Sequence, residues 1–370
     1  MNVGTPRFYV DNTQFMLQSG AIDPSQITLK GENEKGLKLA DLNPANYIIR
    51  ENSGSNDFEI YQVPTGTTDD TGEVHNINYV AVLGHNLTNC MSRLNFESMG
   101  NWGDGNTPKY FHSTTSIINQ PESTAEHPDY NGFSIGLVNQ APTEDKTHWF
   151  RVIMKDISIG GSPVNWQDNL KVGAISVGHY FDMPSSPNMK LTMSIDYGVD
   201  SKETTGGAIL SNKRWTKAPD WLTPAWMLTS NDEYGIAHSE TGNFDSYHSG
   251  QFKDSRTGRR SWNLSFSFME DDDVFSPNLM PNINGINSGD FTDHEADVAD
   301  NGVTFRNQAS FYSQVLHKTM FGHIPFIFQP DNANNSPSGF ALCKLDMKKF
   351  KIKQVSHKVY SMNLKIKEVF

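Results

Sequence analysis

The chain has 370 residues, of which 36% are hydrophobic and 19% charged, and its formal net charge is −12. This length is compatible with two domains or with one large β domain that carries insertions. The negative charge argues against a nucleic-acid binder that works by broad phosphate neutralisation, and against docking on anionic lipid. The 22 Phe, 12 Tyr and 7 Trp residues can nucleate sizeable cores.

The two cysteines, Cys90 and Cys343, lie far apart and match no metal-ligand spacing, so we expect two buried thiols and no cofactor. The first residues lack a basic segment followed by an apolar stretch, and no apolar run approaches the ~20 residues that span a bilayer. We therefore expect synthesis in a cytoplasm without a signal peptide. P-loop, His-Glu-x-x-His and Gly-x-Ser-x-Gly motifs are absent from the sequence, so the corresponding enzyme classes lack support.

In chain order, the first strand signal comes near the N-terminus, where Phe8 and Val10 alternate with polar residues. Such a short strand needs partners elsewhere in the chain. Residues 78–83 form a near-continuous apolar run, which is typical of a strand buried on both faces. His85 and Asn86 follow in a turn. We expect their side chains to satisfy backbone groups there, although a histidine at a strand end could also bind a ligand.

Loop chemistry dominates residues 99–131, which are rich in Gly, Asn, Pro and Ser and predict a long surface loop. Strand signal returns at residues 147–159 and 172–177, and Gly206 and Gly207 mark a turn. Residues 211–250 contain a Trp- and Pro-bearing stretch without a clear period, which we interpret as a linker or arm.

The clearest strand lies at residues 259–268. Its apolar side chains, Trp262, Leu264, Phe266 and Phe268, alternate with Ser and Asn. Residues 281–303 are rich in Asn, Gly and Asp and indicate an inserted acidic loop. A helix is expected next, at residues 309–320, with one apolar stripe and a stop at Gly322. The stripe comprises Phe311, Tyr312, Val315, Leu316 and Met320.

The last strand also alternates. Tyr360, Met362, Leu364 and Ile366 fall on one face, and Ser361, Asn363, Lys365 and Lys367 on the other. This pattern predicts a half-buried antiparallel strand that holds the C-terminus in a sheet. Because exposed strand edges invite pairing with another copy, it also suggests a protein that assembles.

Taken together, these stretches resemble structural proteins of the tail tip of tailed bacteriophages, of the distal-tail or tail-hub kind. The likeness is one of pattern and order, without a catalytic signature. It rests on residues 5–11, on 79–87 with 172–178, and on 258–268 with the helix, 325–331 and the last strand.

The resemblance implies a mainly β protein with two modules. Residues 30–210 would form a galactose-binding-like β-sandwich with the long loop 99–131. Residues 251–370 would form a tail-tube-like β-barrel module with one helix and the acidic insertion 281–303. The N-terminal segment 1–29 would join the second module, and 211–250 would link the two. Tail-tube-like modules imply a ring of subunits, expected here to be a homohexamer.

Asn101, Trp102, Asp104 and Tyr110 lie in or beside the Gly-rich part of the long loop. A flat aromatic face beside amide and carboxylate groups is what sugar binding needs, so these residues are a candidate site for a host-surface glycan. The alternative is that Trp102 folds back and anchors its own loop.

Glu270, Asp271, Asp272 and Asp273 follow the clearest strand. We expect them to border a channel, where like charge keeps passing genome DNA from adhering. Paired carboxylates could instead serve glycoside hydrolysis, but they lack an apolar pocket that would separate their pKa values. The acidic stretch 290–301 could hold Ca²⁺, but its spacing does not match the calcium-loop pattern, and a solvated loop is the better interpretation.

Several residues are candidates for the contact between ring subunits. Lysines concentrate near the C-terminus, where they either guard a solvated strand edge or pair with an acidic neighbour. The expected ring-interface residues are Trp262, Phe266, Lys349, Lys351, Lys353, Lys365 and Lys367.

The sequence thus predicts a structural virion protein, not an enzyme, that forms a ring, continues the tail tube and connects it to receptor-binding components. Its expected partners are copies of itself, tube proteins and hub or fibre proteins, with DNA passing through without specific binding. One alternative is an adsorption protein whose sandwich binds host glycans. Another, a cell-wall hydrolase, would need a carboxylate pair or metal site that we do not find.

Overall fold

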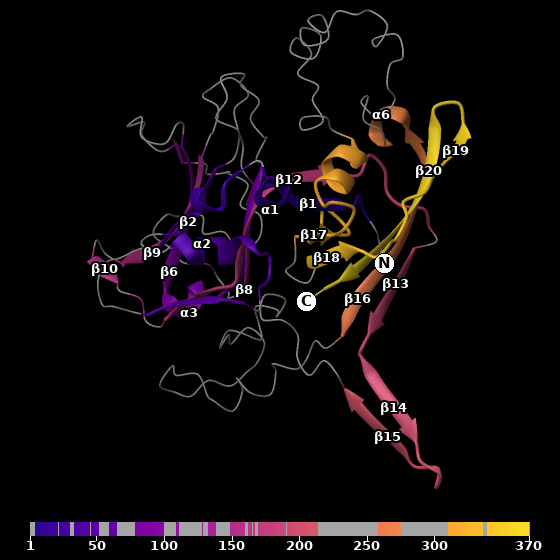
Figure 1. Cartoon of the computed structure of the whole chain (residues 1–370), viewed down its shortest axis with the longest axis horizontal. Helices are drawn as coiled ribbons and strands as arrows, with labels where there is room; N and C mark the ends of the chain where they lie inside the picture. The colour runs from indigo at the N-terminus through magenta and orange to yellow at the C-terminus, as the bar shows by residue number, and fades with distance from the viewer. Residues whose placement is uncertain are drawn as a thin grey trace, which may run out of the picture.

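The computed structural model shows a mainly β protein built around one large antiparallel sheet (Figure 1). The structure describes residues 4–20, 22–29, 33–44, 46–51, 59–64, 78–99, 109–110, 128, 132–137, 149–159, 162–164, 166, 169–189, 191–213, 258–274, 310–335 and 339–369.

The large sheet has ten strands, and its order mixes strands from both ends of the chain. Nine run in the order β13 (Thr192–Asp196), β16 (Arg259–Glu270), β20 (Val359–Glu368), β18 (Ala341–Leu345), β17 (Phe326–Gln329), β1 (Arg7–Asp11), β12 (Ala174–Asp182), β5 (Tyr79–His85) and β8 (Gly132–Leu137). The tenth, β19 (Ile352–Ser356), pairs with β20.

The smaller sheets and the helices pack around this frame. A six-stranded sheet contains β2 (Thr28–Leu29), β4 (Glu59–Pro64), β9 (Trp149–Ile159), β6 (Ser92–Met99), β7 (Lys109–Tyr110) and β10 (Ser162–Val164). Two further pairs are β3 (Ile48–Arg50) with β11 (Leu170–Val172), and β14 (Val199–Glu203) with β15 (Ile209–Lys213). The helices are α1 (Asn12–Ser19), η1 (Pro24–Gln26), α2 (Asn33–Ala40), α3 (Leu87–Cys90), α6 (Asp271–Val274) and η5 (Tyr312–His317).

Two sheets pack face to face in the N-terminal half. Val82 of β5 and Val177 of β12 meet Phe96 of β6 and Val152 of β9 in one buried apolar cluster. Burying apolar side chains from two sheets in a common core is the arrangement of a β-sandwich. α2 closes the same core with Leu39.

The first strand, β1, lies between the two halves of the chain. It pairs with β12 on one side and with β17 on the other. Its alternation divides its side chains between two cores, because Phe8 and Val10 join the C-terminal cluster and Tyr9 joins the cluster on the opposite face. Residues 30–210 and 251–370 therefore contribute strands to one continuous hydrogen-bonded sheet.

Several expectations from the sequence are confirmed. Residues Tyr79–His85 form a strand that is almost entirely buried, and its side chains divide between two cores. In β20, Met362, Leu364 and Ile366 are buried, and the alternate residues from Asn363 to Lys367 are exposed. These outcomes follow directly from side-chain periodicity.

Two expectations are wrong in detail. Phe268 was expected on the buried face of β16, but it is 80% exposed with φ +65°, and Met269 is buried in its place. The cause is an irregularity in the pairing with β20 between Phe266 and Met269, which inserts one extra residue in β16 and reverses the alternation.

The expected regular helix at residues 309–320 is instead the short π-helix η5, which still buries Phe311, Val315 and Leu316. Gly322 does follow it with φ +89°, after left-handed Met320 and Phe321.

Candidate assembly surface

The edge strand β13 is one end of the large sheet. All five of its residues are exposed, and within the described chain it pairs only with β16. Met193 and Ile195 share the face of Trp262 and Arg260, yet they remain 37% and 44% exposed. This edge therefore offers unpaired backbone groups next to half-covered apolar side chains, which is the usual basis for adding another strand.

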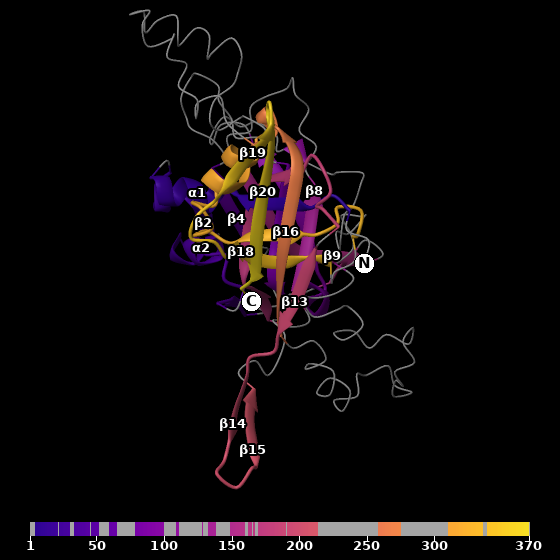
Figure 2. The same cartoon turned by 90° about the vertical axis from the view of Figure 1, so that its right-hand side faces the viewer.

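Strands β14 and β15 form a hairpin arm, residues 199–213, that projects beyond the end of β13 (Figures 1 and 2). The turn at its tip is closed by hydrogen bonds from the amides of Gly207 and Ala208 to Thr204. Because Gly207 has φ +80°, this turn favours glycine there. The sequence predicted a turn at Gly206 and Gly207 but not the arm.

The arm exposes apolar side chains on both of its faces. Val199 and Ile209 lie on one face and Leu210 on the other, with exposures of 55%, 72% and 64%. An isolated two-stranded ribbon is only marginally stable in water, because it has no core of its own. These side chains would become buried if a partner covered the arm.

The corner between β13 and the arm has a defined geometry. The amide of Gly198 donates to Asp196 Oδ1 at 2.8 Å, and Gly198 has φ +60°. On the paired strand, Gly258 has φ +103°, and a Cβ there would lie 2.8 Å from Ile195 Cγ2. Two glycines thus let the chains turn closely where the arm leaves the sheet.

A buried ion pair braces β16 and β20 next to this corner. Arg260 Nη2 lies 3.2 Å from Glu368 Oε1, and the Glu368 side chain is fully buried. Arg260 also donates to the Phe340 carbonyl at 2.6 Å and lies over the Trp262 ring, 5.2 Å from its centroid. Since a buried carboxylate needs hydrogen-bonded compensation, Arg260 is essential to this end of the sheet.

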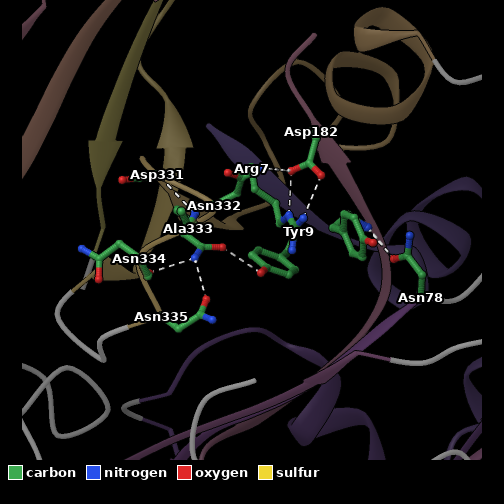
Figure 3. A network of polar contacts seen from close by, with 11 residues as sticks. Arg7, Tyr9, Asn78, Asp182, Asp331, Asn332, Ala333, Asn334 and Asn335 are labelled. Atoms are coloured by element: carbon green, nitrogen blue, oxygen red, sulfur yellow. Dashed lines mark hydrogen bonds and ion pairs between the residues drawn. The ribbon is translucent and has the colours of Figure 1, made fainter. Parts of the chain in front are cut away.

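A second polar network holds β1 in the middle of the sheet (Figure 3). Arg7 forms two hydrogen bonds with Asp182, at 2.6 and 2.7 Å, and its guanidinium lies 4.1 Å from the Tyr180 ring centroid. Tyr9 donates to Gln329 Oε1 at 2.9 Å, and burial raises the pKa of Tyr9 to about 12. The network joins β12, β1 and β17, so its role is to hold the strands together.

The expected ring-interface residues fall into two groups. Trp262 and Phe266 are each 1% exposed and pack inside the chain's own core with Phe328 and Leu364. Their side chains are therefore not on a surface that a neighbour could reach.

The lysines lie on the surface. Lys349 and Lys351 precede β19, and Lys353 is within it. Of these three lysines, Lys353 alone lies on a strand. Lys365 and Lys367 are exposed on β20, and Lys365 Nζ lies 2.7 Å from Asp346 Oδ2.

The four acidic residues divide between the end of a strand and the start of a helical turn. Glu270 closes β16, whereas Asp271, Asp272 and Asp273 begin the helical turn α6. The amide of Glu270 donates to Asp273 Oδ2 at 3.1 Å, so one of these carboxylates caps the turn.

The candidate glycan residues Asn101, Trp102 and Asp104 lie outside the described residues, as do residues 281–303 and most of 99–131. The backbone of Tyr110 is described, and it pairs with Glu97 in β7 and β6.

The other singled-out residues have structural roles. His85 is buried, its Nε2 lies 2.9 Å from Ser134 Oγ, and burial lowers its pKa to about 3. Cys90 and Cys343 are buried thiols, as expected. Among the described residues, no three His, Cys, Asp or Glu side chains gather as a metal site would require.

Comparison with known proteins adds no relative: no protein-family model and no curated protein matches the chain. Within the described part of the chain, no helix is long and apolar enough to cross a membrane. The fold and its exposed surfaces therefore carry the functional argument.

Proposed function

We propose that this chain is a structural protein of a bacteriophage tail, which assembles with copies of itself into a ring near the tail tip. The ring would continue the tail tube and connect it to receptor-binding components. The observation that carries the proposal is the exposed edge strand β13, which leads directly into the projecting arm of residues 199–213.

Two features support self-assembly. The large sheet is open within the described chain, with β13 and β8 as the ends of its main path. In a closed ring every such edge finds a partner, whereas a free monomer leaves it exposed to uncontrolled pairing. The arm adds apolar side chains, Val199, Ile209 and Leu210, that gain free energy when covered.

The finer architecture belongs to the same proposal. The two sheets that pack over Val82, Val177, Phe96 and Val152 would be the galactose-binding-like sandwich. The strands β16, β20, β18 and β17 of residues 251–370, joined by β1 and with η5 over the buried cluster, would be the tail-tube-like module, and β13 of residues 30–210 extends its sheet. In this arrangement the module would form the ring, and the sandwich would lie at its side.

The mass of the purified protein in solution, together with negative-stain images, tests this proposal. We expect rings, with a homohexamer as the specific expectation. The variant Ile209→Asp/Leu210→Asp should shift the mass towards the monomer, because charge replaces the apolar surface of the arm.

The matched control is Ile49→Asp/Val355→Asp, which changes two apolar residues of 48% exposure away from the arm. This control should leave the rings intact. A wild-type protein that is monomeric at micromolar concentration and shows no rings would refute the proposal.

A further inference from the structure

The outward face of β16 and β20 has an unusual composition. It is the face opposite the apolar core that contains Trp262, Leu264 and Met362. Beyond the irregularity near Phe268 the face ends in Glu270 opposite Val359, but from Ser261 to Ser265 the cross-strand pairs place only Ser, Asn and Lys together on it. The residues are Ser261, Asn263, Ser265, Ser361, Asn363, Lys365 and Lys367. We call this set, with Lys353 of β19 and Lys344 of β18, the lysine face.

The lysine face is open in the described structure. Figure 2 looks onto β16 and β20, with strands of the N-terminal half behind them. Asn263, Asn363, Lys353, Lys365 and Lys367 are exposed. The face is thus accessible along much of the length of both strands.

Its charge is positive although the whole chain is strongly acidic. Lys344 and Lys367 are directly opposite each other, an arrangement of like charges that costs stability. The acids beside the face are Asp346, which pairs with Lys365, Asp196, which lies opposite Arg259 at the β13 side, and Glu270, which lies opposite Val359 at the other end. Basic groups therefore exceed acidic groups here, and a negatively charged partner would relieve their repulsion.

We infer that the lysine face binds the phosphate backbone of double-stranded DNA without reading its sequence. Lys, Ser and Asn side chains are the groups that contact phosphate oxygens in protein–DNA complexes. The backbone positions opposite Lys353 and at Lys367 are six residues apart on β20, or roughly 20 Å. Over that distance a duplex presents about twelve phosphate charges.

Other partners fit this face less well. A protein interface has an apolar core with aromatic or other large anchors, whereas the centre of the lysine face carries Ser, Asn and Lys, and the apolar Phe268 and Val359 lie at one end of it. A single-stranded nucleic acid would need a row of aromatic side chains on which successive bases could stack, whereas the exposed Phe268 is a single aromatic at one end of this face. The net charge of −12 limits the binding to a local, weak and salt-sensitive contact.

Fluorescence anisotropy of a labelled duplex, titrated with the full-length protein over a range of salt concentrations, tests the inference. The wild type should bind at low salt and release the duplex as salt rises. The variant Lys353→Gln/Lys367→Gln should lower the slope of log K against log salt by about 2, or one unit per lysine. Lys353→Arg/Lys367→Arg should retain binding, since the charge is kept.

The matched control is Lys38→Gln/Lys171→Gln, which removes the same charge from α2 and β11. It should keep the wild-type slope. The inference is refuted if the duplex does not bind at low salt, if the control loses binding equally, or if single strands bind more tightly than the duplex. A change of oligomeric state in Lys353→Gln/Lys367→Gln would identify the face as a protein contact instead.

This inference does not rest on the proposed ring. The lysine face excludes the free edge of β13 and the arm, so the arm variants and the lysine variants test separate surfaces. A monomeric protein that binds duplex DNA would refute the proposed function and would still support this inference.

Discussion

The buried Lys318 provides a quantitative test of the fold. It follows the π-helix η5, is 2% exposed, and its burial lowers the pKa from 10.5 to about 7. The titratable groups nearby are His179 of β12 and His317 of η5, and burial also lowers the pKa of both, to about 3 for His179. Both imidazoles are therefore neutral above pH 7 and do not change charge there.

The sign of the effect follows from proton binding. Between pH 7 and 9 the unfolded chain keeps a proton on Lys318, whereas the folded protein loses it. Stability therefore rises with pH where the unfolded state binds more protons. With pKa values of 10.5 and about 7, the free energy of unfolding should increase by about 2 kcal/mol from pH 7 to 9.

Urea unfolding of the wild type and of Lys318→Met at both pH values measures this increase. Lys318→Met should be more stable than the wild type at pH 7 and should lose the rise, because no buried ammonium has to form. Lys171→Met, which changes an exposed lysine of β11, should retain it. An equal rise in the wild type and in Lys318→Met would refute the assignment.

Three further predictions concern single contacts, each measured by urea unfolding. Arg260→Met should destabilise the fold by about 3–5 kcal/mol, because Glu368 stays buried without its partner, and adding Glu368→Gln should recover part of the loss. Gly322→Ala should cost about 1–3 kcal/mol, since φ is +89° and the new Cβ would lie 2.7 Å from Leu345 Cβ; a loss within error would contradict this. Burial raises the pKa of Asp11 to about 6, above its unfolded value. The folded protein therefore binds this proton more tightly than the unfolded chain, and the resulting stabilisation is lost as pH rises through 6. Asp11→Asn should therefore gain about 1 kcal/mol relative to the wild type between pH 5 and 7, and a constant difference would refute it.

The local features that were predictable from the sequence are those that depend on side-chain period. Met362, Leu364 and Ile366 alternate with polar residues and face the core, because a regular strand has no other way to bury them. Phe268 shows the limit of that reasoning. Its exposure is decided by a pairing irregularity with β20, a strand almost a hundred residues away in sequence.

The arm was missed for a related reason. Val199, Ile209 and Leu210 lie on both faces of a ribbon that has no core of its own, so no period marks it. The lysine face was predictable in part. The alternation of β20 predicts that Lys365 and Lys367 share one face, whereas the residues around them follow from the pairing of β20 with β16, β18 and β19. Which strands become neighbours is decided by contacts distant in sequence, and local pattern does not carry that information.

The place of β1 between β12 and β17 has a consequence for how the protein is made. A ribosome produces Phe8 and Tyr9 more than 300 residues before their partners Phe328 and Ile327. The middle of the sheet therefore cannot close until β17 has been synthesised, and such distant pairings form slowly. Until then, β1 in the nascent chain lacks its partner strand β17. A chaperone can bind the free edge of β1, or another copy of the chain can pair with it prematurely.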